Sequence, residues 1–170
     1  MSREKVYLVD KGNKIIGEKF RDQLVDSDCW RVISIWVTDK SGNILLQQRS
    51  MNKKVGPGIW SAACEGTIEV GDVPLETAVR ELSEEIGLEV SEGSLTKTTR
   101  TYYKDPQFGW RITYGYKLVI EHTNESDFVL QKEEVAQVKW YSPRELKEFI
   151  KNNPEKFPLE ATYTKLGFIS

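Results

Sequence analysis

One amphipathic segment of this 170-residue chain constrains the fold more than any other. Its apolar residues recur at spacings of four, three and four, at Leu75, Val79, Leu82 and Ile86. A helix over residues 73–86 would place them on one face. Asp72 and Pro74 fit the start of such a helix, and Gly87 fits the position just past its end. The sequence therefore predicts a helix that packs its apolar face on another layer.

Apolar and β-branched runs on both sides of this helix predict strands. They lie at residues 6–9, 15–17, 31–37, 44–49, 95–103, 112–120 and 135–141. The run 31–37 is nearly continuous in apolarity, as expected for a central strand covered on both faces. A short helix is expected at residues 21–25, and Ser142 should cap a further helix that ends near residues 152–154. Helices interspersed among strands predict an α/β fold with a mixed sheet.

Composition narrows the class of protein. With 39% hydrophobic and 29% charged residues, the chain can build one domain with a real core. The net charge of −2 argues against binding a nucleic acid polymer through bulk charge. We expect no export signal and no membrane span, reduced thiols at Cys29 and Cys64, and a cytoplasmic location. The sequence leaves a homodimer open.

The predicted helix also carries a concentrated acidic face. Glu81, Glu84 and Glu85 fall within a narrow arc, and like charges at these spacings destabilise a helix by roughly 0.2–0.5 kcal/mol per pair. Arg80 and Arg49 are the obvious cations nearby. A divalent cation would stabilise the three carboxylates, and hard oxygen ligands favour Mg²⁺ or Mn²⁺. A solvated acidic face is the alternative.

A spaced pattern surrounds this acidic face. It consists of Gly66, Asp72, Arg80, Glu81, Leu82, Glu84, Glu85, Gly87 and Leu88. The pattern resembles the signature of the Nudix hydrolase family, except that Asp72 stands where the family usually has glutamate. The resemblance implies a Nudix α/β/α sandwich with a mixed β-sheet flanked by helices. We expect this domain over residues 30–153, with an N-terminal extension of short strands over 1–29 and a C-terminal tail over 154–170.

The resemblance also implies a role for each matched residue. The implied metal ligands are Glu81, Glu84, Glu85 and the backbone carbonyl of Gly66. Arg80 would orient Glu81 through an ion pair, so these residues form the implied catalytic set. Bound Mg²⁺ or Mn²⁺ would polarise a diphosphate and help to deprotonate the attacking water. The general base of the family is either a glutamate of this helix or one from a later loop, for which Glu133 and Glu134 are candidates.

A basic loop follows the predicted strand over residues 44–49. Residues 49–60 are similar to the diphosphate-binding loop of isopentenyl-diphosphate isomerases, which share the Nudix fold, and the similarity to that branch covers roughly residues 6–150. Arg49 offers a two-pronged guanidinium and Lys53 a mobile point charge, so both are candidates for binding substrate phosphates. The alternative is a solvated basic loop.

The resemblance to the isomerases is poor where their chemistry lies. Glu65 occupies the place of the isomerase catalytic cysteine, and Cys64 is one residue too early. The places of the isomerase's histidine ligands read Gln23, Trp30 and Thr67, and residues 108–112 replace its glutamate-bearing loop. A non-catalytic binding module of the same fold would not need three glutamates on one face. The expected function is therefore hydrolysis of a diphosphate bond in a nucleoside diphosphate derivative or another organic diphosphate.

The organic end of such a small-molecule substrate is not specified by the pattern. Aromatic residues concentrate in one third of the chain, at Tyr102, Tyr103, Phe108, Trp110, Tyr114 and Tyr116. They would either stack on a nucleobase or pack in the sheet. Trp36 and Trp60 are expected in the core, Cys64 as a small buried residue, and His122 on the surface.

Overall fold

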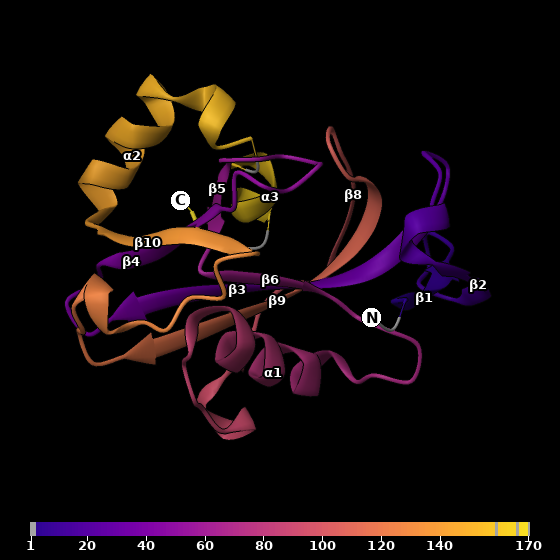
Figure 1. Ribbon diagram of the computed structural model, residues 1–170, viewed down its shortest axis with the longest axis horizontal. Coiled ribbons are helices and arrows are strands. Elements are labelled where there is room, and N and C mark those ends of the chain that lie inside the picture. The colour runs from indigo at the N-terminus through magenta and orange to yellow at the C-terminus, as the bar shows by residue number, and fades with distance from the viewer. Residues whose placement is uncertain (1–2, 159, 166, 170) are drawn as a thin grey trace.

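The computed structural model describes residues 3–158, 160–165 and 167–169. The strands are β1 (Lys5–Val9), β2 (Ile15–Phe20), β3 (Cys29–Asp39), β4 (Ile44–Arg49), β5 (Trp60–Ala62), β6 (Cys64–Thr67), β7 (Thr96–Lys97), β8 (Thr101–Asp105), β9 (Gly109–Ile120) and β10 (Val135–Tyr141). The α-helices are α1 (Pro74–Ile86), α2 (Pro143–Asn152) and α3 (Glu160–Lys165). Figure 1 shows α1 on one side of the sheet and α2 with α3 on the other. No helix in the described ranges has the length and apolarity to span a bilayer.

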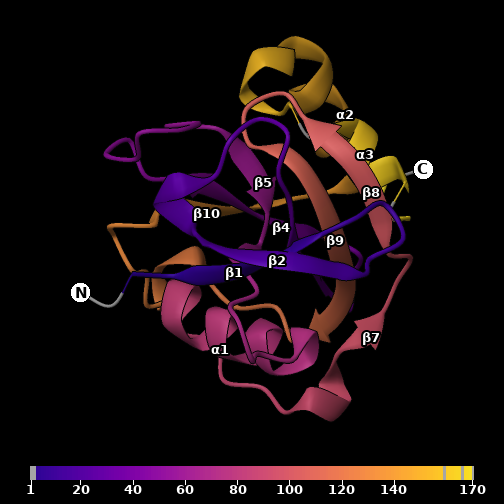
Figure 2. The same cartoon turned by 90° about the vertical axis from the view of Figure 1, so that its right-hand side faces the viewer.

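β3 is the central strand, as its apolar run predicts. It pairs in parallel with β9 from Cys29 beside Trp110 to Asp39 beside Ile120, and it pairs antiparallel with β1, β4 and β6. Figure 2 shows the β1–β2 hairpin crossing one end of this sheet. The fold is therefore an α/β arrangement with a mixed sheet between helical layers, which confirms the predicted class.

The two faces of β3 pack against different helices because side chains alternate along a strand. The face toward α1 carries Ile33, Ile35 and Val37, which pack with Ala78, Leu82 and Ile86 of that helix. The opposite face carries Trp36, which packs with Trp60, Phe157, Tyr163 and Phe168. The core positions expected for Trp36 and Trp60 are thus confirmed.

Both long helices form where the sequence predicts them, with one correction at a helix start. Ser142 caps α2 by accepting a hydrogen bond from Glu145 N–H, and Gly87 ends α1 with φ 69°. Asp72 does not cap α1, because the N-cap is Val73 and the Asp72 carboxylate accepts a hydrogen bond from Arg80 at 2.8 Å. Asp72 instead forms an ion pair with Arg80 in the second turn of the same helix.

Three strand and helix predictions differ from the structure. The strand expected over residues 95–103 is split into β7 and β8, because the three residues 98–100 lie opposite the two residues 114–115 of β9 and form a bulge. The sequence predicts neither β5 nor β6, since Trp60–Ala62 is only three residues long and Cys64–Thr67 shows neither alternation nor a β-branched run. The helix expected at 21–25 is only a 3₁₀ turn over Arg21–Gln23.

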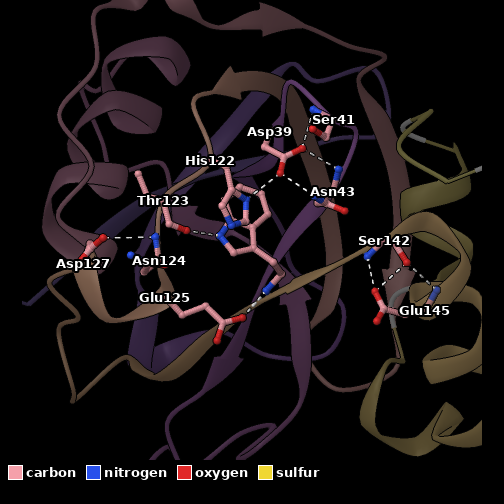
Figure 3. A network of polar contacts seen from close by, with 11 residues as sticks. Asp39, Ser41, Asn43, His122, Thr123, Asn124, Glu125, Asp127, Ser142 and Glu145 are labelled. Atoms are coloured by element: carbon pink, nitrogen blue, oxygen red, sulfur yellow. Dashed lines mark hydrogen bonds and ion pairs between the residues drawn. The ribbon is translucent and has the colours of Figure 1, made fainter.

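A polar network joins the far end of β3 to the segment after β9 (Figure 3). The Asp39 carboxylate accepts hydrogen bonds from the backbone of Ser41 and Asn43, and it pairs with His122 Nδ1 at 2.8 Å. Burial alone would raise the pKa of Asp39, but hydrogen bonds from Asn43, His122 and Ser41 outweigh burial and lower the pKa from 3.8 to about 2. His122 itself is 55% exposed, which confirms its expected surface position.

This network makes folding stability depend on pH. A lowered pKa means that ionised Asp39 stabilises the fold above about pH 4, and that this contribution is lost as the pH falls toward 2. We expect Asp39→Asn to lower the free energy of unfolding at neutral pH and to converge with the wild type in acid. Urea denaturation of both proteins across this range, with the exposed Glu148→Gln as a control, measures the difference. A difference that stays constant with pH would contradict this assignment.

Candidate functional site

One cavity of about 460 Å³ extends from the glutamates of α1 past β6 to residues of β3, β8 and β9. Its outer end is formed by Glu81, Glu84 and Glu85 of α1 and by Gly66 of β6. Its side wall comes from β4, β5 and the loop before β10, through Gln47, Arg49, Ile59, Ser61, Gln131 and Glu134. Its inner end is formed by Trp30, Glu65, Tyr103, Phe108 and Arg111. The fold therefore brings the predicted acidic face and one cation of the predicted phosphate-binding loop, Arg49, to the same cavity.

Glu81 lies directly against Gly66. A Cβ placed on Gly66 would stand 2.6 Å from Glu81 Cγ, so only glycine leaves room for this side chain. Arg80 Nη2 lies 3.6 Å from Glu81 Oε1, while Arg80 Nη1 bonds Asp72 at 2.8 Å. Burial raises the pKa of Glu81 to about 7, with Arg80 acting in the opposite direction and Glu84 adding to the rise.

Glu85 is the most deeply buried of the three glutamates, with 6% of its surface exposed. Its Oε2 accepts hydrogen bonds from Cys64 Sγ at 3.3 Å and from Gln47 Nε2 at 3.5 Å. Burial raises the pKa of Glu85 to about 8, and the charge of Glu81 adds to the rise. The sulfur of Cys64 is fully buried and bonded to this carboxylate, as expected for a small packed residue beside the site.

The three carboxylates have the chemistry of a divalent cation site. Glu84 is exposed, and all three line the outer end of the cavity. In the described part of the chain no three acidic, histidine or cysteine side chains already surround one point closely enough to hold an ion. Metal binding by this set therefore stays a prediction and requires side-chain rotation. The donor set fits a hard cation, because a cation would remove the cost of burying Glu81 and Glu85 as anions.

The inner end of the cavity holds a further carboxylate, Glu65, to which the sequence pattern assigns no role. Glu65 pairs with Ser34 across the β3–β6 ladder, and its Oε1 accepts hydrogen bonds from Ser34 Oγ at 3.1 Å and Tyr163 Oη at 2.8 Å. Burial raises the pKa of Glu65, while Arg111, Tyr163 and Ser34 oppose the rise. Tyr163 comes from α3, so the segment after residue 153 contributes to the site.

Arg111 is the other unassigned charged residue at the inner end. It is 8% exposed, and its Nη2 donates to Asp105 Oδ2 at 2.7 Å. Its guanidinium lies 4.7 Å from the ring centroid of Phe108 and 5.7 Å from that of Tyr103. In the sequence Arg111 stands directly before the predicted strand 112–120, and no local pattern marks it as a cavity residue.

The two cations of the predicted phosphate-binding loop are placed differently. Arg49 lines the cavity, with Nε donating to Val55 O at 2.9 Å and its guanidinium 5.4 Å from the Phe108 ring centroid. Lys53 does not line the cavity, and its Nζ bonds Glu134 Oε1 at 2.7 Å. Arg49 can therefore contact a molecule in the cavity directly, whereas Lys53 acts on the cavity through Glu134.

The remaining predicted residues divide in the same way. Of the two late-loop carboxylates, Glu134 is half-buried and lines the cavity, whereas Glu133 is exposed and does not. Of the clustered aromatics, Tyr103 and Phe108 line the cavity. Tyr102 and Trp110 instead stack on each other at 4.9 Å, and Tyr116 is buried in the core.

Comparison with known proteins agrees with this geometry. The model of the NUDIX domain matches residues 30–163. The isopentenyl-diphosphate Delta-isomerase of Streptomyces coelicolor is 32% identical over 143 residues, which span 83% of this chain and 72% of that protein. The Nudix hydrolase YfcD of Escherichia coli K12 is 30% identical over 147 residues, which span 85% of this chain and 77% of that protein. The crystal structure of DR0079 from Deinococcus radiodurans covers 88% of this chain and 90% of its own with a TM-score of 0.73 at 19% identity, which shows a shared fold.

The buried Glu85 gives a prediction for the metal-free protein. A carboxylate whose folded pKa is about 8 and whose ordinary value is 4.5 destabilises the fold progressively as the pH rises between these values. We expect Glu85→Gln to be about 1–3 kcal/mol more stable than the wild type at pH 8 in EDTA, and equally stable near pH 4. Denaturant titrations at both values measure the change. Glu84→Gln on the exposed side of the same helix is the control, and an equal gain there would contradict the role of burial.

Proposed function

The chain belongs to the Nudix family, and from this premise we propose that it is a hydrolase that cleaves the diphosphate bond of a nucleoside diphosphate derivative or another organic diphosphate with Mg²⁺ or Mn²⁺. One observation carries the proposal: the three glutamates of α1 and the guanidinium of Arg49 line the same cavity. A diphosphate needs a cationic side chain and a metal site beside it, because its oxygens carry negative charge that builds during the displacement. The cavity has the guanidinium of Arg49 for the first role and the three glutamates for the second.

We assign the metal site to the outer end of the cavity. Glu81, Glu84 and Glu85 would hold the ion together with the backbone carbonyl of Gly66. When bound, Mg²⁺ or Mn²⁺ supplies polarisation of the phosphoryl oxygens and lowers the pKa of a coordinated water. Arg80 orients Glu81 and is itself held by Asp72, so the shorter Asp72 side chain still performs a positioning role at the start of the helix.

Glu134 is our candidate for the residue that accepts a proton from the attacking water, as an alternative to a glutamate of α1. It lines the cavity, and Lys53 Nζ holds its carboxylate at 2.7 Å. Glu133 has neither property and is a residue of the exposed loop in this proposal.

Isomerisation is the less well supported function, despite the similarity to isopentenyl-diphosphate isomerases. The sulfur of Cys64 is fully buried and bonded to Glu85, so it does not face the cavity as a free acid or base. The single histidine of the chain, His122, pairs with Asp39 and is not among the cavity residues. The partner we propose is a small-molecule diphosphate in the cytoplasm, with neither a nucleic acid polymer nor a membrane surface.

The hydrolase proposal predicts loss of turnover without loss of fold in Glu81→Gln. The amide cannot replace a carboxylate ligand, so turnover should fall about a hundredfold or more, while removal of one like charge should keep or raise the melting temperature. Release of mononucleotide or phosphate from a panel of organic diphosphates with Mg²⁺ or Mn²⁺ measures the activity. Glu76→Gln, exposed on the first turn of α1, is the matched control. A wild-type protein that cleaves no diphosphate in the panel would exclude the proposed function.

Arg49 and Lys53 should differ in their effect on the best substrate of that panel. Arg49→Ala removes a charged contact to phosphate and should lower kcat/KM about ten- to a hundredfold with little change in melting temperature. Lys53→Ala should have a smaller effect, because Lys53 acts through Glu134 and does not line the cavity. Lys54→Ala on the exposed neighbour is the control. If Arg49→Ala hydrolyses the substrate with wild-type kinetics, the phosphates bind elsewhere.

A further inference from the structure

The N-terminal extension brings two charged side chains to the cavity that the proposed hydrolysis does not use. Its β1–β2 hairpin crosses one end of the sheet (Figure 2), and Val6 of β1 forms an antiparallel bridge with Glu69, in the segment that joins β6 to α1. Glu4, directly before β1, and Arg21, directly after β2, line the cavity together with Glu81 of α1. The extension therefore forms part of the cavity wall.

Arg21 and Glu4 form an ion pair on this wall. Arg21 Nη1 lies 2.5 Å from Glu4 Oε2, and the two side chains are 44% and 43% exposed. A backbone hydrogen bond from Arg21 N–H to Glu4 O at 2.9 Å joins the same two residues. An exposed ion pair contributes little to the stability of a fold, and here the backbone bond holds the two residues together without it. The side chain of Arg21 can therefore change its partner with little effect on the fold.

The position of this ion pair distinguishes it from the others of the extension. Three further cations of the extension pair with carboxylates, and neither these cations nor their partners line the cavity: Arg3 with Asp22, Lys5 with Glu18 and Lys19 with Asp28. Among the ion pairs described in residues 3–29, only that of Arg21 with Glu4 has both members in the cavity wall. Arg21 can therefore reach a molecule in the cavity, as Arg49 can.

Each member of this pair stands near a group of its own charge. Burial lowers the pKa of Arg49, Glu134 opposes this effect, and the charge of Arg21 lowers the pKa further. Burial raises the pKa of Glu81 to about 7, and the charge of Glu4 adds to the rise. Two guanidinium groups that face one cavity repel each other, and a phosphate group that accepts hydrogen bonds from both would remove this repulsion.

We propose that Arg21 is a further phosphate-binding residue, and that Glu4 occupies its guanidinium until a diphosphate takes the place of the Glu4 carboxylate. This inference rests on the proposed function, in that it adds a second cationic side chain to the diphosphate site of the hydrolase. Glu4 engages Nη1 of Arg21, and a guanidinium has further N–H groups in a planar fork that matches two phosphate oxygens. Glu4 is thereby an internal competitor of the substrate.

A second arginine on the cavity favours ligands with two phosphoryl groups. A diphosphate has oxygens on both phosphorus atoms, so two guanidinium groups can each bind a different phosphoryl group. A single phosphate has fewer oxygens and less negative charge to share between them. We therefore expect Arg21 to strengthen the binding of a diphosphate more than that of a monophosphate.

The test separates phosphate binding from hydrolysis. Methylenediphosphonate is a diphosphate analogue whose P–C–P linkage is not hydrolysed, and isothermal titration calorimetry in Mg²⁺ buffer measures its dissociation constant and that of inorganic phosphate. We expect Arg21→Ala to bind methylenediphosphonate about tenfold more weakly than the wild type, to lose less affinity for phosphate, and to keep its melting temperature. Arg3→Ala, on the same extension but outside the cavity wall, is the matched control and should leave both constants unchanged.

Glu4→Gln tests the competition with a change of opposite sign. The neutral amide holds the guanidinium of Arg21 less strongly than the carboxylate does, so methylenediphosphonate should bind about two- to fivefold more tightly. The double variant Glu4→Gln with Arg21→Ala should bind no more tightly than Arg21→Ala alone, because the gain requires the released guanidinium. A gain that persists in the double variant would show that Glu4 only repels the anion, and would overturn the exchange.

The remaining outcomes also decide the inference. Unchanged binding of methylenediphosphonate in Arg21→Ala, or an equal loss in Arg3→Ala, would overturn the role of Arg21, as would no binding by the wild type up to about 10 mM. Hydrolysis of diphosphates together with such a result would leave the hydrolase function intact. Conversely, weaker binding in Arg21→Ala by a protein that cleaves no diphosphate would support the phosphate site and exclude the proposed hydrolysis.

Discussion

The long parallel pairing of β3 with β9 is the constraint on which both the core and the site depend. It joins residues about eighty positions apart, from Cys29 beside Trp110 to Asp39 beside Ile120. A parallel pair requires a long crossover, and here the crossover contains β4, β5, β6 and α1. One face of the pair is thereby buried under α1, while the other face packs Trp36 against Tyr163 of α3 and lines the inner end of the cavity with Trp30 and Arg111.

The site concentrates charged groups where burial makes them costly, and the two ends of the cavity compensate for this cost differently. At the inner end the protein supplies most of the partners itself, through the Arg111–Asp105 ion pair and the two hydroxyl groups on Glu65. At the outer end Glu81 and Glu85 have raised pKa values because few partners offset their burial. An added cation would therefore stabilise the outer end more than the inner end, because the charged groups of the inner end already have partners within the protein.

Short-range patterns of the sequence predicted the helices and most strands well. α1 follows from the spacing of its apolar residues, and the cap at Ser142 follows from the residues after it. Predictions failed where tertiary contacts competed with local ones: Asp72 pairs with Arg80 instead of capping, and β6 forms only because β3 offers a pairing edge. The bulge between β7 and β8 has no local sequence signal.

The sequence by itself determined the acidic face of α1, because helical spacing places Glu81, Glu84 and Glu85 within one narrow arc, and the spaced pattern indicated Gly66 and Arg49 as candidates. Only the tertiary structure decided that Arg49 and not Lys53 lines the cavity, and that Glu134 and not Glu133 faces it. At the inner end the sequence indicated only the aromatic residues Tyr103 and Phe108 as candidates. Trp30, Glu65, Tyr103 and Arg111 lie on four different strands, and the register of strand pairing, which no local periodicity encodes, places them on one cavity.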